Sequence, residues 1–90
     1  MTEKIMTIRN RMGLHARPAA MFVQEAGKFK CQVFVVKDGL QVNGKSVMGL
    51  MLLAAESGSK LTIKADGPDE AKAIEALEKL FERKFDEEGR

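Results

Sequence analysis

The sequence has one cysteine, one histidine, two prolines and no tryptophan or tyrosine. A single cysteine excludes a framework of internal disulfides and fits a reducing compartment, so we expect a cytoplasmic protein. Cys31 itself is interpreted as a small packing residue. One cysteine and one histidine are too few preferred ligands for a structural zinc site, and we expect no metal and no cofactor.

The chain also lacks an excess of charge of one sign. Its 15 lysines and arginines nearly balance 13 aspartates and glutamates, for a net charge of +2. That balance, with no Trp or Tyr for base stacking, argues against nucleic-acid binding. No apolar run reaches membrane-spanning length, and the first ten residues lack the apolar region of a signal peptide, so we expect neither membrane insertion nor secretion. Ninety residues predict one domain, over 1–90, and we expect a monomer.

The elements that are present alternate along the chain with short connections. Asp38-Gly39 is typical of a hairpin turn, and Gly67-Pro68-Asp69-Glu70 indicates the start of the last helix. The apolar face of that helix is expected from Ile74, Leu77, Phe81 and Phe85. Strands are predicted over 3–8, 32–37, 40–43 and 60–66, and helices over 16–27, over 47–53 and from about 70 onward.

This order predicts an α+β fold with βαββαβα topology. Helices that are segregated from an open, mostly antiparallel sheet give an open-faced sandwich, with a four-stranded sheet and three helices on one face.

The only histidine stands in G-L-H-A-R-P-A-A at 13–20. Gly13 permits a turn with positive φ, and Pro18 is tolerated only in the first turn of a helix. His15 is therefore expected where a loop becomes a helix, with unpaired backbone N–H groups just beyond it. Arg17 adds a fixed positive charge to the same turn, and a helix start beside a guanidinium suits a doubly charged anion.

We interpret His15 as a phosphoryl acceptor, with Ala16 and Arg17 binding the phosphate. The alternative is that His15 is a helix cap, a surface residue or a satisfied core group, which is the commoner role of a lone histidine.

A second segment of interest is V-N-G-K-S-V-M-G-L-M-L-L at 42–53. Ser46 stands directly before an apolar run, and it is interpreted either as a helix N-cap alone or as a phosphorylation site at a helix start. Nine apolar residues in succession, 47–55, cannot all face the core of a short helix. We expect part of this run on the surface as a patch for an adaptable partner; the alternative is that its residues fill the core. The candidate patch residues are Val47, Met48 and Met51.

The two motifs, G-L-H-A-R-P-A-A at 13–20 and K-S-V-M-G at 45–49, together resemble the HPr family over essentially the whole chain. These are the histidine-containing phosphocarrier proteins of the bacterial phosphoenolpyruvate-dependent sugar phosphotransferase system. The resemblance implies a carrier and not an enzyme. It implies that His15 accepts phosphate on Nδ1 from phospho-enzyme I and passes it to a IIA domain, with Arg17 steadying the phosphohistidine. The resemblance also implies that Ser46 is modified by HPr kinase/phosphorylase, beside an apolar docking patch at Val47, Met48 and Met51.

Some features depart from that pattern. Gly44 stands where many kinase-regulated relatives have Leu, and Ala20 where they often have Thr.

Two other classes of protein stay open at this point. One is a phosphocarrier of the regulatory nitrogen branch, to which L-M-L-L at 50–53 and K-F-D-E-E at 84–88 are weakly similar. The other is a module of the same fold that binds a small anion and is never phosphorylated, against which the pairing of a histidine with Arg17 argues.

Overall fold

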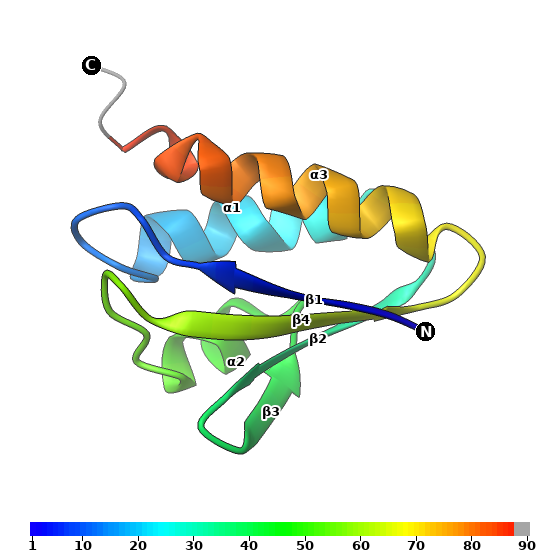
Figure 1. Ribbon diagram of the computed structural model, residues 1–90, viewed down its shortest axis with the longest axis horizontal. Helices are drawn as coiled ribbons and strands as arrows, with labels where there is room; N and C mark the ends of the chain where they lie inside the picture. Colours follow the sequence, from blue (N-terminus) through cyan, green and yellow to red (C-terminus); the bar gives the residue numbers. More distant parts are fainter. Residues whose placement is uncertain (88–90) are drawn as a thin grey trace.

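The computed structural model describes residues 1–87, which form a four-stranded sheet, three α-helices and a C-terminal 3-10 turn (Figure 1). The sheet order is β1-β4-β2-β3, and every neighbouring pair is antiparallel. The predicted α+β fold with βαββαβα topology is therefore confirmed. The elements are β1 (Thr2–Thr7), α1 (Ala16–Ala26), β2 (Gln32–Lys37), β3 (Leu40–Asn43), α2 (Val47–Leu52), β4 (Lys60–Asp66), α3 (Glu70–Glu82) and η1 (Lys84–Asp86).

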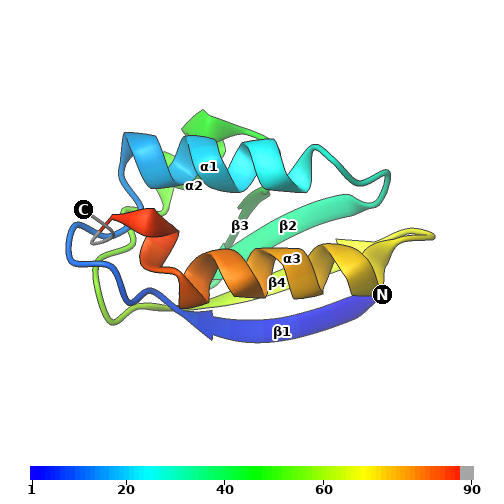
Figure 2. The same ribbon diagram turned by 90° about the horizontal axis from the view of Figure 1, so that it is seen from above.

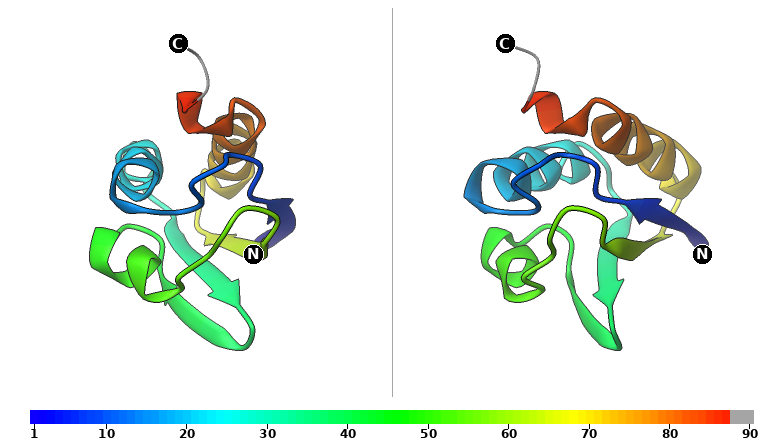
Figure 3. Two further views of the ribbon diagram at one scale, coloured as in Figure 1. Left: turned by 90° about the vertical axis from the view of Figure 1, so that its left-hand side faces the viewer. Right: turned by 60° about the vertical axis from the view of Figure 1, so that its left-hand side comes forward.

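The core lies between the sheet and the helices. Figures 2 and 3 show α1 and α3 side by side over one face of the sheet, and α2 packs against α1 and β3. In β4, buried Leu61, Ile63 and Ala65 alternate with more exposed residues, which is the period-two pattern of a half-buried strand. Phe22 of α1 meets Phe81 of α3 edge-on, with ring centroids 6.2 Å apart. This aromatic pair joins the two long helices.

Two local predictions, the hairpin turn and the buried cysteine, are confirmed by the structure. Asp38 and Gly39 have φ values of 50° and 84°, the two positive values that a tight primed hairpin turn requires. Cys31 is 1% exposed, and burial, followed by its contact with Asp69, raises the pKa of its thiol. A buried thiol of that kind is a packing residue.

The end of the last helix differs from the prediction. We expected Phe85 on the apolar face of that helix, but α3 ends at Glu82. Lys84, Phe85 and Asp86 have φ values of 55°, 52° and 56°, a left-handed conformation that no α-helix can contain. The turn folds the chain back toward α1 (Figure 2) and buries Phe85 with its ring centroid 5.0 Å from that of Phe81.

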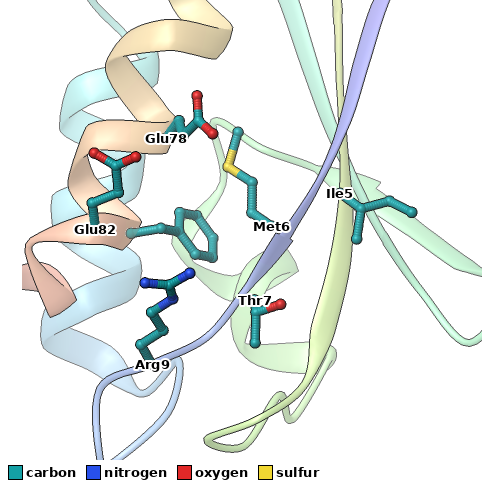
Figure 4. A pocket seen from close by; sticks show the side chains of 7 residues that line it. Ile5, Met6, Thr7, Arg9, Glu78 and Glu82 are labelled. Carbon is teal, nitrogen blue, oxygen red and sulfur yellow. The ribbon is translucent and has the colours of Figure 1, made fainter.

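A shallow depression of about 120 Å³ lies between β1 and α3. Figure 4 shows Met6 and Arg9 pointing toward α3, whereas Ile5 points away to the opposite side of β1. Glu78 and Glu82 line the helix side of this depression. None of its lining residues belongs to 13–20 or 45–49, so it is separate from both motifs of interest.

Candidate functional site

His15 stands at the boundary between a loop and α1. It is the N-cap residue, with an extended backbone (φ −87°, ψ −166°), and its side chain makes no capping bond. The preceding Leu14 is buried and donates its N–H to the carbonyl of Ala55 at 2.9 Å, which anchors the loop. The side chain of His15 is 43% exposed. The imidazole is therefore fixed at its base and open to solvent at its ring.

The groups beside His15 suit an anion. Ala16 and Arg17 are the first two residues of α1, and their N–H groups make no hydrogen bond within residues 1–87. The guanidinium of Arg17 is exposed and forms no ion pair within the same range. The structure thus places all three predicted residues in one helical turn, where two N–H donors and one guanidinium have no partner among the described residues.

The loop before His15 is shaped by Gly13 and Asn10. Gly13 has a φ of 74°, as expected, and a Cβ at this position would lie only 2.6 Å from the carbonyl oxygen of Ala55. Asn10 is fully buried, and its amide nitrogen donates to the carbonyl of Gly13 at 2.7 Å. The loop is thereby held tightly against the segment around Ala55.

A carboxylate also reaches this site, from the turn that follows α3. Oε1 of Glu87 accepts the N–H of Met12 at 3.2 Å, and its Oε2 lies 3.4 Å from the amide nitrogen of Asn10. The same Oε2 lies 3.4 Å from Nε2 of His15. Burial raises the pKa of Glu87, but the donors from Met12, Asn10 and His15 outweigh it, and the pKa falls below its ordinary range.

Glu87 is a part of the site that the sequence motifs did not reveal. It is 72 residues from His15 in the sequence, and the segment that contains it, K-F-D-E-E at 84–88, gave no indication of a role beside the histidine. With Phe85, it lines a depression of about 180 Å³ that His15 and Arg17 also line. The only signal was the last apolar position, Phe85, which implied that the C-terminal segment returns to the core.

Ser46 is the N-cap of α2, and its Oγ accepts the N–H of Gly49 at 3.0 Å. Around it, Met48 is 80% exposed and Met51 45% exposed, whereas Val47 is half-buried against the core. Leu52 is a further exposed apolar residue, at 73%. Met48 and Leu52 are four residues apart on α2 and share one face of it.

The described residues also include no cluster of three or more His, Cys, Asp or Glu side chains that could hold a metal ion. Across residues 1–87, no helix is both long enough and apolar enough to span a bilayer.

The fold and the site together define a class: a small open-faced α+β protein that presents an exposed histidine at the start of a helix. A family model described as the PTS HPr component phosphorylation site matches residues 2–83. The chain therefore belongs to the HPr family, the phosphocarrier proteins of the phosphotransferase system.

Individual relatives agree with that assignment. The phosphocarrier protein HPr of Treponema pallidum is 48% identical over 88 residues, covering 98% of this chain and 100% of the relative. The HPr-like protein Crh of Halalkalibacterium halodurans is 51% identical over 83 residues, covering 92% and 99%. A crystal structure of HPr from Thermoanaerobacter tengcongensis superposes with a TM-score of 0.93 at 50% identity, covering 97% of this chain and 98% of the other.

Proposed function

We propose that this chain accepts a phosphoryl group on Nδ1 of His15 from phospho-enzyme I and passes it to IIA domains of the sugar phosphotransferase system. The observation that carries the proposal is the exposed imidazole beside the N–H groups of Ala16 and Arg17 and the guanidinium of Arg17, for which residues 1–87 offer no partner. Family membership supports the class of reaction, and this arrangement supports His15 as its site.

In phosphoryl transfer, the protein contributes mainly the alignment of the reacting groups and the stabilisation of their charge. Phosphoryl transfer is governed by positioning and by stabilising the oxygens of the moving group. The two free N–H groups at the start of α1 and the guanidinium of Arg17 would receive those oxygens. A helix-start contact contributes only about 0.3–1 kcal/mol, which orients a phosphate without trapping it. A carrier needs that balance, because it must release the group to the next protein.

Replacing Arg17 with alanine is expected to slow phosphorylation of His15 by about 10- to 100-fold. A charge-assisted hydrogen bond contributes about 1.5–3 kcal/mol, and each 1.4 kcal/mol changes a rate tenfold. Arg17 is exposed, so the unfolding midpoint should stay unchanged. The measurement is the rate of acid-labile phosphate incorporation with enzyme I and phosphoenolpyruvate. Arg17→Lys keeps the positive charge but lacks the planar guanidinium, so its phosphorylation rate should fall between those of the wild type and Arg17→Ala. A wild-type rate in Arg17→Ala would contradict the proposed role of Arg17.

We propose Ser46 as a regulatory phosphorylation site for HPr kinase/phosphorylase. Its Oγ caps α2, and a phosphate there would sit at a helix N-terminus and leave the helix folded. The new charge would stand beside the apolar surface of Val47, Met48 and Met51, which we propose as the docking patch for enzyme I and IIA domains. Every residue of this proposed machinery lies in one copy, so we propose a monomer as the working form.

Negative charge at Ser46 is therefore expected to slow phosphotransfer from enzyme I by about tenfold or more, since a mismatched charge weakens docking. Ser46→Asp tests this without the kinase, and Ser46→Asn is its matched control because both residues are good N-caps. The expected order of transfer rates is wild type, then Ser46→Asn close behind, with Ser46→Asp far slower. Equal rates for the two variants would rule out a charge effect.

The proposed function is tested by measuring the incorporation of labelled phosphate from phosphoenolpyruvate into this protein. The assay is run with purified enzyme I of the sugar type and, separately, with enzyme I of the nitrogen type. Acid-labile phosphate on the protein with the sugar-type enzyme supports the proposal. Labelling only by the nitrogen-type enzyme would assign the chain to the regulatory branch. A tight complex with inorganic phosphate and no label with either enzyme would indicate a module that only binds anions.

A further inference from the structure

We propose that Glu87 is a positioning residue for His15: its carboxylate takes the Nε2–H of the imidazole and so directs the Nδ1 lone pair toward the incoming phosphoryl group. This inference rests on the proposed function. Its starting point is the 3.4 Å contact between Oε2 of Glu87 and Nε2 of His15. A neutral imidazole carries its proton on one nitrogen only, and a carboxylate can only accept, so this contact selects the tautomer protonated at Nε2.

Glu87 is held in place by more than the histidine. The Met12 N–H and the amide of buried Asn10 both donate to the carboxylate, at 3.2 Å and 3.4 Å. Only 16% of the Glu87 side chain is exposed, compared with 43% for His15. The carboxylate is thus the better-fixed partner, and the ring adjusts to it.

The turn that precedes Glu87 determines where its side chain lies. The three preceding residues, Lys84 to Asp86, all have positive φ, a conformation that costs energy for residues other than glycine. Such a turn persists only when its surroundings hold it, and here Phe85 is buried against Phe81. Figures 2 and 3 show this turn folded over toward the start of α1 and the loop before it. Phe85 therefore anchors the turn, and Glu87 projects from it onto the loop.

The charge on Glu87 also matches the charge that the ring gains. In the transfer, the Nδ1 lone pair forms the N–P bond while the bond from phosphorus to the donor breaks, and that electron pair leaves with the donor. Nε2 keeps its proton, so the product ring is a phosphoimidazolium with one positive charge. A carboxylate at Nε2–H stabilises this cation as it forms, in the way that an orienting aspartate supports a catalytic imidazolium. When the phosphoryl group moves on, the ring returns to the neutral Nε2–H form.

The decisive variants are Glu87→Gln and Asp86→Asn. Glutamine keeps the length and can still accept the Met12 N–H, but it removes the charge. Asp86 is the matched control, because it lies in the same turn and pairs with Arg83 and not with His15. Two readouts are taken on the full chain: the ring ¹⁵N shifts of unphosphorylated His15, and the initial rate of phosphorylation from phosphoenolpyruvate with enzyme I.

In Glu87→Gln, we expect the Nε2–H tautomer to lose population and phosphorylation to slow by about two- to fivefold, the range of a partly exposed ion pair. Asp86→Asn should match the wild type in both readouts. Unchanged shifts and an unchanged rate in Glu87→Gln would overturn the proposal and leave Glu87 as a structural clamp. A faster rate would overturn it as well, because it would mean that the carboxylate repels the incoming phosphate. If wild-type protein takes up no phosphate, the proposed function fails, while the ¹⁵N shifts still decide whether Glu87 sets the tautomer.

Discussion

Replacing His15 with alanine is expected to abolish acid-labile phosphorylation by enzyme I and phosphoenolpyruvate. The phosphoryl group would be carried covalently by a ring nitrogen, and alanine offers no nucleophile at this position. The second possible acceptor, Ser46, lies at the start of α2 and forms an acid-stable ester, which the same assay separates from phosphohistidine. The measurement is incorporation of labelled phosphate before and after acid treatment.

The loss should be chemical and not structural. The His15 side chain is 43% exposed and makes no helix-capping bond, so the fold should tolerate alanine with a change of about 0.5 kcal/mol or less. Glu87 keeps its bonds to Met12 and Asn10 in this variant, which preserves the C-terminal turn. Wild-type labelling of His15→Ala would show that the phosphate resides elsewhere.

Replacing Gly13 with alanine is expected to destabilise the protein by about 2–5 kcal/mol. A left-handed φ of 74° costs a non-glycine residue about 1–2 kcal/mol, and overpacking adds about 1–3 kcal/mol. The clash is with backbone: the new Cβ would lie 2.6 Å from the carbonyl oxygen of Ala55. Relief requires moving the loop, which also carries Met12 and His15, so phosphorylation should slow. Urea denaturation measures the first effect and the labelling rate the second.

Gly39→Ala is the matched control for that variant. Gly39 has a similar φ of 84°, but nothing lies within 4 Å of its would-be Cβ. It should therefore show only the conformational cost, about 1–2 kcal/mol, with a normal phosphorylation rate. If Gly13→Ala proves no more destabilised than Gly39→Ala, then the close approach to Ala55 contributes nothing.

The sequence was sufficient for those parts of the fold that depend on local rules. Alternation in β4, the Asp38-Gly39 turn and the Gly13…Pro18 helix start each follow from a few adjacent residues. The predicted bounds 32–37, 40–43 and 60–66 match β2, β3 and β4, and the first strand is displaced by one residue. The motif residues His15, Ala16 and Arg17 meet in space because they occupy one turn.

Features that depend on distant contacts were not predictable in the same way. No glycine or proline stands at the end of α3, after Glu82, to indicate that the helix stops there. The left-handed turn that follows is stabilised by the packing of Phe85 against Phe81. Glu87 reaches His15 only through that turn. Asn10 stands in the loop before His15, with nothing in the sequence to mark it as a core residue, yet it is fully buried. Of the C-terminal segment 84–88 that suggested the nitrogen branch, residue 88 lies outside the described residues.

The central claim is that Nδ1 of His15 carries the phosphate, and ³¹P and ¹⁵N NMR of the wild-type protein tests it most directly. The protein, labelled with ¹⁵N, is incubated with enzyme I and phosphoenolpyruvate, and coupling between phosphorus and the ring nitrogens identifies the bonded atom. We expect one phosphorus bound to Nδ1, with the proton retained on Nε2 beside Glu87. Phosphorus on Nε2, on Ser46 or on no residue at all would contradict the account.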